Sequence, residues 1–167
     1  MLPVHLDFTN KQVVIAGGGS VALRRAKALC TEPCHITVVS PNLSEEMANL
    51  IDTYQLNWKE KKVDAEDLKD AFFIVAATND PSVNEWIAQT AQPHQLVNCV
   101  SQSELGNVMV PKVVKAGKVT ISVSTSGASP ARTKQLAAAI ESLLEQEDID
   151  TLDALYIERK KRQRKSR

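Results

Sequence analysis

VVIAGGGSVALRRAKAL, residues 13–29, is the stretch that decides the fold of this chain. Its first four residues are apolar and mostly β-branched, which is typical of a strand buried on both faces of a parallel sheet. Three glycines follow, and after them Ala22, Ala26 and Leu29 recur at helical spacing. We therefore predict a strand, a tight turn and a helix in direct succession.

The glycine turn is suited to binding a phosphate. The first turn of a helix leaves backbone N–H groups unpaired at the positive end of the helix dipole. The spacing Gly17-x-Gly19-x-x-Ala22 matches the dinucleotide fingerprint, in which small residues allow the turn, the approach of the diphosphate and close helix packing. Because turns that bind nothing can share this spacing, the surrounding elements decide what it means.

The surrounding pattern is that of an α/β fold. Further strands are predicted at 35–39, 72–76 and 96–99, with helices at 44–54 and 81–91 and an acidic connector before the third strand. Strands separated by helices pair in parallel, with helices on both faces of the sheet. A doubly wound sheet places its dinucleotide at the first strand–helix turn, where the glycines lie. We therefore predict a dinucleotide-binding site there.

The pattern changes after residue 100. A short apolar piece at 108–111 precedes a strand of alternating polarity at 118–123. Pro130 then begins an amphipathic helix, capped by Ser129, which should run to about residue 147. Elements this small cannot enclose a core of their own, so we expect their apolar surfaces to meet a second copy of the chain. The sequence therefore predicts a homodimer.

Charge is distributed unevenly along a chain that is neutral overall. The last nine residues, RKKRQRKSR, contain seven of the twenty basic residues, which leaves the preceding body acidic. A short helix predicted at 151–161 leads into this tail. A basic tail can bind nucleic acid non-specifically. Because no aromatic residues lie between the charges, and the acidic body would repel phosphates, we interpret the tail as a solvated or disordered end and predict no nucleic-acid partner.

Length and composition narrow the class of protein. A chain of 167 residues has room for one nucleotide-binding domain and a smaller appendage. We see no signal segment and no apolar run long enough to span a bilayer, so we expect a cytoplasmic protein without a membrane partner. Cys30, Cys34 and Cys99 lack the spacing of a metal site or a disulfide framework, and we expect small buried or half-buried residues.

Several dispersed motifs occur together in this chain: LPVHLDFTNKQVVIAGGGSVALRRAKAL at 2–29, TVVSP at 37–41, AATND at 76–80 and SGASP at 126–130. In this combination and order they resemble the precorrin-2 dehydrogenases, the NAD-dependent enzymes of sirohaem synthesis. The resemblance implies that precorrin-2 is oxidised to sirohydrochlorin, with NAD+ as hydride acceptor. Some members of the family also insert Fe2+ to give sirohaem.

The resemblance also implies a domain organisation. It indicates an NAD-binding Rossmann domain at 1–110, with a parallel sheet. A small α+β dimerisation region would follow at 111–147, with strands and a helix that exchange between protomers. A short C-terminal helix and the basic tail would occupy 148–167.

Carried over to this sequence, the resemblance assigns NAD to three segments. Residues 17–21 would hold the diphosphate, 40–42 would flank the adenosine ribose, and 77–79 would line the nicotinamide side. A typical NAD site has an acidic residue at the ribose, where this chain has Ser40; a serine can bond a 2′-hydroxyl without repelling a 2′-phosphate. The preference for NAD over NADP therefore rests on the resemblance. The cofactor-binding residues are Gly17, Gly18, Gly19, Ser20, Val21, Ser40, Pro41, Asn42, Ala77, Thr78 and Asn79.

The expected catalytic position departs from the family. Where the family has Asn-Val-Val-Asp after the fourth strand, with the aspartate as general acid or base, this chain has NCVS ending at Ser101. A hydroxyl is a poor proton acceptor, and Glu104 is the nearest spare carboxylate. Oxidation can tolerate this loss because the nicotinamide carries the hydride, whereas metal insertion must remove pyrrole protons. We therefore take Ser101 and Glu104 as the candidate catalytic residues, and predict a dehydrogenase with little or no ferrochelatase activity.

The binding site for the implied substrate needs cationic groups and hydrogen-bond donors, because precorrin-2 is a tetrapyrrole rich in carboxylates. Arg132 and Lys134 lie just inside the helix that begins at Pro130, and 124–126 supplies three hydroxyls. The alternative is that these are ordinary exposed helix residues and turn residues. The candidate substrate-binding residues are Ser124, Thr125, Ser126, Arg132 and Lys134.

Two other functions stay open at this point. One is a bifunctional dehydrogenase and ferrochelatase, against which Ser101 argues. The other is a regulatory module that binds a dinucleotide and a tetrapyrrole without turnover.

Overall fold

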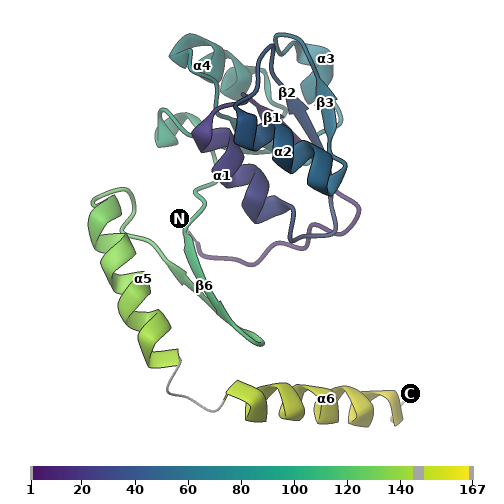
Figure 1. Cartoon of the computed structure of the whole chain (residues 1–167), viewed down its shortest axis with the longest axis vertical. Coiled ribbons are helices and arrows are strands. Elements are labelled where there is room, and N and C mark those ends of the chain that lie inside the picture. The colour runs from purple at the N-terminus through teal and green to yellow at the C-terminus, as the bar shows by residue number, and fades with distance from the viewer. Residues whose placement is uncertain (1, 145–148, 166–167) are drawn as a thin grey trace. The chain divides into compact units, whose positions relative to one another are not determined.

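The computed structural model describes residues 2–144 and 149–165. The chain forms two compact units, Met1–Met109 and Val110–Arg167, which we call the N-terminal and the C-terminal unit. The division of roles proposed from the resemblance, with a dimerisation region and a separate C-terminal helix, stays a prediction. Each unit is described by itself below (Figure 1).

The N-terminal unit is built on a five-stranded sheet in which every neighbouring pair of strands is parallel. Its central strand places Val13 beside Ile36 on one side and beside Phe73 on the other. This is the predicted α/β fold with a doubly wound Rossmann-type sheet. In spatial order the strands are β3 (Asn57–Lys59), β2 (His35–Val39), β1 (Gln12–Ala16), β4 (Phe73–Ala76) and β5 (Leu96–Cys99).

The helices of this unit form two pairs. Helix α1 (Ser20–Leu29) packs against α2 (Glu45–Tyr54), and α3 (Ala65–Leu68) packs against α4 (Pro81–Thr90) (Figure 1). Val14 and Ile74 belong to the core cluster that contains Ile87 of α4. Since side chains alternate along a strand, Val13 and Ile15 face the opposite side of the sheet, and both are almost fully buried. The core therefore lies on both faces, as a parallel sheet requires.

The structure first differs from the sequence-based expectation in the segment between α2 and β4, which was predicted to be a connector without strand or helix. It contains the edge strand β3 and the one-turn helix α3. All three residues of β3 are exposed, so no apolar alternation marked the strand. A single capped turn is likewise too short to show a helical period.

The C-terminal unit begins with a hairpin of β6 (Lys112–Ala116) and β7 (Val119–Val123), an antiparallel pair. Helix α5 (Pro130–Leu144) contributes Ala137 to a small core with Val114 and Val123. The expected cap is confirmed, because Ser129 Oγ accepts the Arg132 N–H at 3.2 Å. The apolar piece at 108–111 is not part of a strand, since β6 starts after it. The predicted last turn of α5, to residue 147, lies outside the described residues.

The second difference concerns the basic tail. Helix α6 spans Ile149–Lys165 and so continues beyond the helix predicted at 151–161; the tail is helical to Lys165 rather than disordered, and the described side chains of 154–162 are exposed, as expected for a solvated end. Lys118 and Lys160 hold their ammonium groups 4.9 Å and 5.7 Å from the centre of the Tyr156 ring. Within the described parts of the chain, no helix has the length and apolar character needed to cross a membrane. The three cysteines have free thiols; Cys99 is buried and the other two are half-buried, as predicted.

Candidate cofactor site

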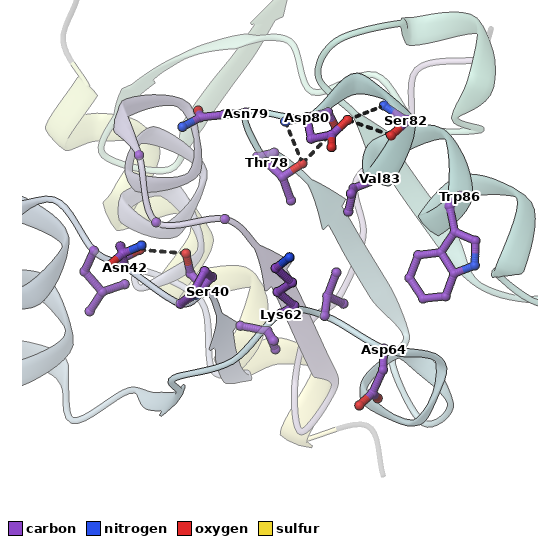
Figure 2. A pocket seen from close by; sticks show the side chains of 18 of the residues that line it. Ser40, Asn42, Lys62, Asp64, Thr78, Asn79, Asp80, Ser82, Val83 and Trp86 are labelled. Carbon is purple, nitrogen blue, oxygen red and sulfur yellow. Dashed lines mark hydrogen bonds between the residues drawn. The ribbon is translucent and has the colours of Figure 1, made fainter.

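A cavity of about 790 Å³ lies where β1, β2 and β4 end, at the carboxyl edge of the N-terminal sheet (Figure 2). Ligand pockets commonly have volumes of this order. The carboxyl edge, at the point where the strand order reverses, is where open α/β sheets bind their ligands. Nine of the predicted cofactor residues line the cavity: Gly17, Gly18, Gly19, Ser40, Pro41, Asn42, Ala77, Thr78 and Asn79.

The three glycines of the turn have different structural roles. Gly17 has φ of +120°, and a Cβ there would lie 2.2 Å from the carbonyl oxygen of Ala77. A Cβ on Gly18 would lie 2.2 Å from the carbonyl oxygen of Asn42. At Gly19 the nearest atom, Asn79 Oδ1, would be 3.9 Å away, so the protein leaves this position open. The first two glycines are therefore required by the chain itself, whereas the third leaves space in front of the helix N-terminus.

This open space is the test of whether a dinucleotide fits. Gly19 is the N-cap of α1, and no side chain caps that helix end. A diphosphate can therefore reach the free N–H groups of the first turn at the positive end of the dipole. Ser20 and Val21 begin that helix, so their backbone N–H groups are available to a diphosphate although neither residue lines the cavity; the expectation that 17–21 hold the diphosphate stays a prediction.

The turn after β2 is held rigidly. Ser40 is 7% exposed, and its hydroxyl donates to the carbonyl oxygen of Asn42 at 2.6 Å. The Ser40 carbonyl oxygen accepts a hydrogen bond from Trp58 Nε1 at 3.0 Å. The position that carries an acidic residue in many NAD sites is therefore filled here by a serine whose hydroxyl proton is already used. Its lone pairs can still accept a hydrogen bond from a ribose hydroxyl.

Asn84 connects the loop after β4 to the loop after β5. This side chain of α4 is 1% exposed. Its Oδ1 accepts from the Thr78 N–H at 2.9 Å and from the Thr78 hydroxyl at 2.8 Å. Its Nδ2 donates to the Thr78 carbonyl at 3.1 Å and to Ser101 Oγ at 3.3 Å. A buried amide with four bonds fixes Thr78 at the cavity and holds Ser101 relative to it.

The two candidate catalytic residues are less well placed. Ser101 is exposed, accepts the bond from Asn84 and lies 3.5 Å from the Cys99 sulfur, but it does not line the cavity. Glu104 is exposed in a short 3-10 turn, where its carboxylate accepts a long hydrogen bond of 3.5 Å from the Ser103 hydroxyl. Neither residue is paired with a second acid or base in a way that would activate it. Their catalytic role stays a prediction.

One wall of the cavity comes from the loop that leads into α3. Asp64 caps this helix, with its carboxylate accepting the Asp67 N–H at 3.2 Å and its own N–H donating to Asp67 at 3.1 Å. The Asp67 side chain is 2% exposed and lies 2.9 Å from the ammonium groups of Lys59 and Lys61. Burial opposes ionisation of Asp67, but the hydrogen bonds from Lys61, Lys59 and the Asp64 N–H outweigh it and lower its pKa.

The ionised form of Asp67 therefore stabilises the folded chain. We expect Asp67→Asn to lower the free energy of unfolding at neutral pH, because two lysines lose their buried partner. A carboxyl whose pKa is lowered by folding contributes its stability above its unfolded-state pKa of about 4, and loses it as the pH falls through the folded-state value. Urea unfolding across this pH range should show the cost of the substitution shrinking toward acid. A cost that does not change with pH would contradict this account, and Glu66→Gln, at an exposed neighbouring carboxylate, is the matched control.

The candidate substrate residues all lie in the C-terminal unit. Arg132 and Lys134 are exposed on the first turns of α5, and Arg132 donates to Gln135 Oε1 at 3.2 Å. The Thr125 hydroxyl accepts the Ser129 N–H at 3.1 Å and lies 3.0 Å from the Thr133 hydroxyl, so it holds the turn before α5. Ser126 has a left-handed backbone with φ of 52°. Thr125 therefore stabilises the turn before α5, and the substrate-binding role of these residues stays a prediction.

Sequence reasoning missed one side of the cavity. The missed residues come from the loop after β3 and from the first turns of α4, and the main ones are Lys62, Val63, Asp64, Val83 and Trp86. Val83 and Trp86 stand three residues apart, so helical spacing after Pro81 could have identified this face. The cavity residues of the loop after β3 could not be identified from the sequence, because β3 itself was not predicted.

The fold and the glycine site together define an NAD(P)-binding protein of the Rossmann class. A family described as "Putative NAD(P)-binding" matches residues 4–112. The precorrin-2 dehydrogenase of Bacillus subtilis (strain 168) is 49% identical over 162 residues, covering 97% of this chain and all of that protein. That of Priestia megaterium is 41% identical over 142 residues, covering 85% of this chain and 70% of that one. The solved structure "SirC, precorrin-2 dehydrogenase" has a TM-score of 0.75 at 40% identity, covering 89% of this chain and 72% of that chain. This chain belongs to the precorrin-2 dehydrogenase family.

Proposed function

We propose that this chain oxidises precorrin-2 to sirohydrochlorin with NAD+ in sirohaem synthesis. The observation that carries the proposal is the open backbone at Gly19, at the end of β1, in a chain 49% identical over its near-full length to a precorrin-2 dehydrogenase. When bound, NAD+ supplies the acceptor for a hydride, so that two electrons leave the substrate. The remaining substrate proton passes to solvent or to a base.

The residues of the chain would then bind and orient. The backbone of Gly17, Gly18 and Gly19 would hold the diphosphate, with Ser40 and Asn42 beside the ribose. Asn84 would keep Thr78 at the cavity wall and Ser101 at a fixed distance behind it. The substrate carboxylates would be bound by Arg132 and Lys134, which are exposed cations near the N-terminus of α5.

We also propose that the chain works as a homodimer in the cytoplasm, without a membrane or nucleic-acid partner. The C-terminal unit buries only a small core, while Leu136 and Leu143 of α5 are 37% and 63% exposed. Exposed leucines on a helix of this kind support association with a second copy. A monomeric mass by light scattering at working concentration would contradict the dimer.

The serine at position 101 leads to a prediction about metal insertion. We expect the wild type to insert Fe2+ into sirohydrochlorin slowly or not at all, because no carboxylate stands at this position to take the pyrrole protons. The Ser101→Asp variant should gain at least ~10-fold in that rate. The new carboxylate would be exposed, and it could accept the Asn84 Nδ2 bond that Ser101 accepts now, so the fold has room for it.

The matched control is Ser101→Asn, which has nearly the size of aspartate and no base. Formation of sirohaem under anaerobic conditions, followed by its absorption spectrum, is the measurement. Equal rates for the aspartate and asparagine variants would show that a base at this position does not limit insertion. Fast insertion by the wild type would favour the bifunctional enzyme instead.

The experiment that tests the proposed function is an anaerobic assay of the purified chain with enzymatically prepared precorrin-2 and NAD+. We expect one NADH for each sirohydrochlorin formed. Binding of both ligands without turnover would overturn the dehydrogenase and favour the regulatory module.

A further inference from the structure

We infer that the adenosine end of the cofactor cavity accepts a 2′-phosphate, so that this chain binds NADP+ as well as NAD+, with Lys62 as the cation that pairs with the phosphate. The inference rests on the proposed function and concerns the same site. It assigns a role to a residue of the loop after β3, which sequence reasoning did not connect with the cofactor.

Strand pairing brings Lys62 to the ribose position. Strand β3 runs parallel to β2, with Val39 beside Lys59. The Ser40 N–H donates to the Lys59 carbonyl at 3.2 Å, so the loops that follow both strands start side by side. Lys62 stands three residues beyond Lys59 and lines the cavity together with Ser40. A cation three residues along this loop is within reach of a group attached to the ribose.

The ammonium of Lys62 faces the cavity rather than a salt bridge. Figure 2 shows it pointing toward the loop that carries Thr78 and Asp80. The neighbouring lysines, Lys59 and Lys61, are paired with Asp67. Among the residues that the structure describes, none places a carboxylate within 4.0 Å of the Lys62 ammonium. Lys62 is therefore the lysine of this loop that is available to an anionic ligand.

The two carboxylates that line the cavity are already occupied. Asp64 accepts from Lys61 at 2.6 Å and caps α3, and in Figure 2 it points away from Lys62. Asp80 accepts the N–H and the hydroxyl of Ser82, at 2.9 Å and 2.7 Å, at the N-terminus of α4. These bonds from Ser82 lower the pKa of Asp80, and the charge of Lys62 adds a smaller effect in the same direction, which places Lys62 in electrostatic contact with the cavity wall.

The ribose position also lacks the group that excludes a 2′-phosphate. NAD-specific sites commonly have an acidic residue at the end of the second strand, which binds the ribose hydroxyls and repels a phosphate. Here Ser40 fills this position, and its hydroxyl proton is held by the Asn42 carbonyl. A neutral serine with a free cation nearby is the arrangement that tolerates either form of the cofactor.

The test compares two fragments that lack nicotinamide: ADP-ribose and its 2′-phosphorylated form. Calorimetric titration of the full chain should give dissociation constants within ~10-fold of each other. The Lys62→Gln variant should weaken binding of the phosphorylated fragment by about 10–100-fold, the range for loss of one charge-assisted bond, and weaken binding of ADP-ribose by a clearly smaller factor. Lys62→Arg should retain both affinities, and added salt should weaken binding of the phosphorylated fragment more.

Lys69→Gln is the matched control. This exposed lysine is the C-cap of α3 and does not line the cavity, and its ammonium pairs with Glu66 at 3.5 Å. The affinities of Lys69→Gln for both fragments should therefore equal those of the wild type. A wild type that binds ADP-ribose but rejects its 2′-phosphate by more than ~100-fold would overturn the inference and leave the proposed function intact. Equal losses for both fragments in Lys62→Gln would overturn the assignment to the 2′-phosphate. A wild type that binds neither fragment would remove the cofactor site, and the proposed function with it.

Discussion

Replacing Gly17 with alanine is expected to lower the free energy of unfolding by at least ~3 kcal/mol, from the combined cost of overpacking and a strained backbone. The φ angle of +120° is unfavourable for a residue with a Cβ, and that Cβ would lie 2.2 Å from the Ala77 carbonyl oxygen. The neighbouring backbone cannot easily move, because Gly17 N–H bonds the Val39 carbonyl and Ala77 N–H bonds the Ala16 carbonyl. Urea unfolding followed by circular dichroism measures the loss.

Gly127 offers a matched control for this prediction. It also has a positive φ, +85°, but nothing lies within 4 Å of the position of its Cβ. Gly127→Ala should therefore cost only about 1 kcal/mol, the price of the left-handed backbone alone. If both alanines cost the same, the close approach of Gly17 to β4 would not be the reason for this glycine.

The Gly19→Ala variant is expected to fold normally and to lose NAD+ affinity by at least ~10-fold. Its φ of −90° and ψ of −172° suit alanine, and the nearest atom to the added methyl group would be Asn79 Oδ1 at 3.9 Å. The unfolding free energy should stay within about 1 kcal/mol of the wild type, since only a weak N-cap preference is lost. The methyl group would instead occupy the space in front of α1 where the diphosphate must approach.

The control for this second prediction is Lys27→Gln, which changes an exposed residue in the last turn of the same helix. Calorimetric titration with NAD+ and a thermal melt of each variant separate binding from folding. A Gly19→Ala variant that binds NAD+ as the wild type does would mean that the ligand does not approach the backbone there. If the variant lost stability as well as NAD+ affinity, the result would contradict the proposal that the space at Gly19 is kept open for the ligand and is not needed for folding.

The fold was largely predictable because its strands carry their own signals. The buried strands β1, β2, β4 and β5 are short and mostly apolar, and the caps Ser44 and Asp80 mark the helices that follow. Strand β3 was not predictable, because an exposed edge strand of three residues shows no apolar alternation and is stabilised by contacts with residues distant in the sequence. The beginning of α6 was predicted at 151–161, but its continuation through the basic residues to Lys165 was not, because a run of basic residues gives little evidence of a helix.

The site was predictable where it lies on the chain segments that end the central strands. The glycine turn was predicted from local sequence, whereas Ser40 and Thr78 were assigned from the resemblance; all three lie in the segments that follow β1, β2 and β4. Asn84 was not predictable, because a single amide on a helix does not reveal which loops it will bond. Lys62 depended on β3, and once that strand was missed its place beside Ser40 could not be derived.

The central claim is that the glycine turn holds a dinucleotide. The most direct measurement is a titration of isotope-labelled protein with NAD+, followed by NMR of the backbone amides. We predict that the largest shifts occur at the amides of Gly18, Gly19 and Ser20, which form the turn after β1 and the first residue of α1. Saturating NAD+ that leaves these amides unmoved, or that shifts only residues elsewhere, would contradict this claim.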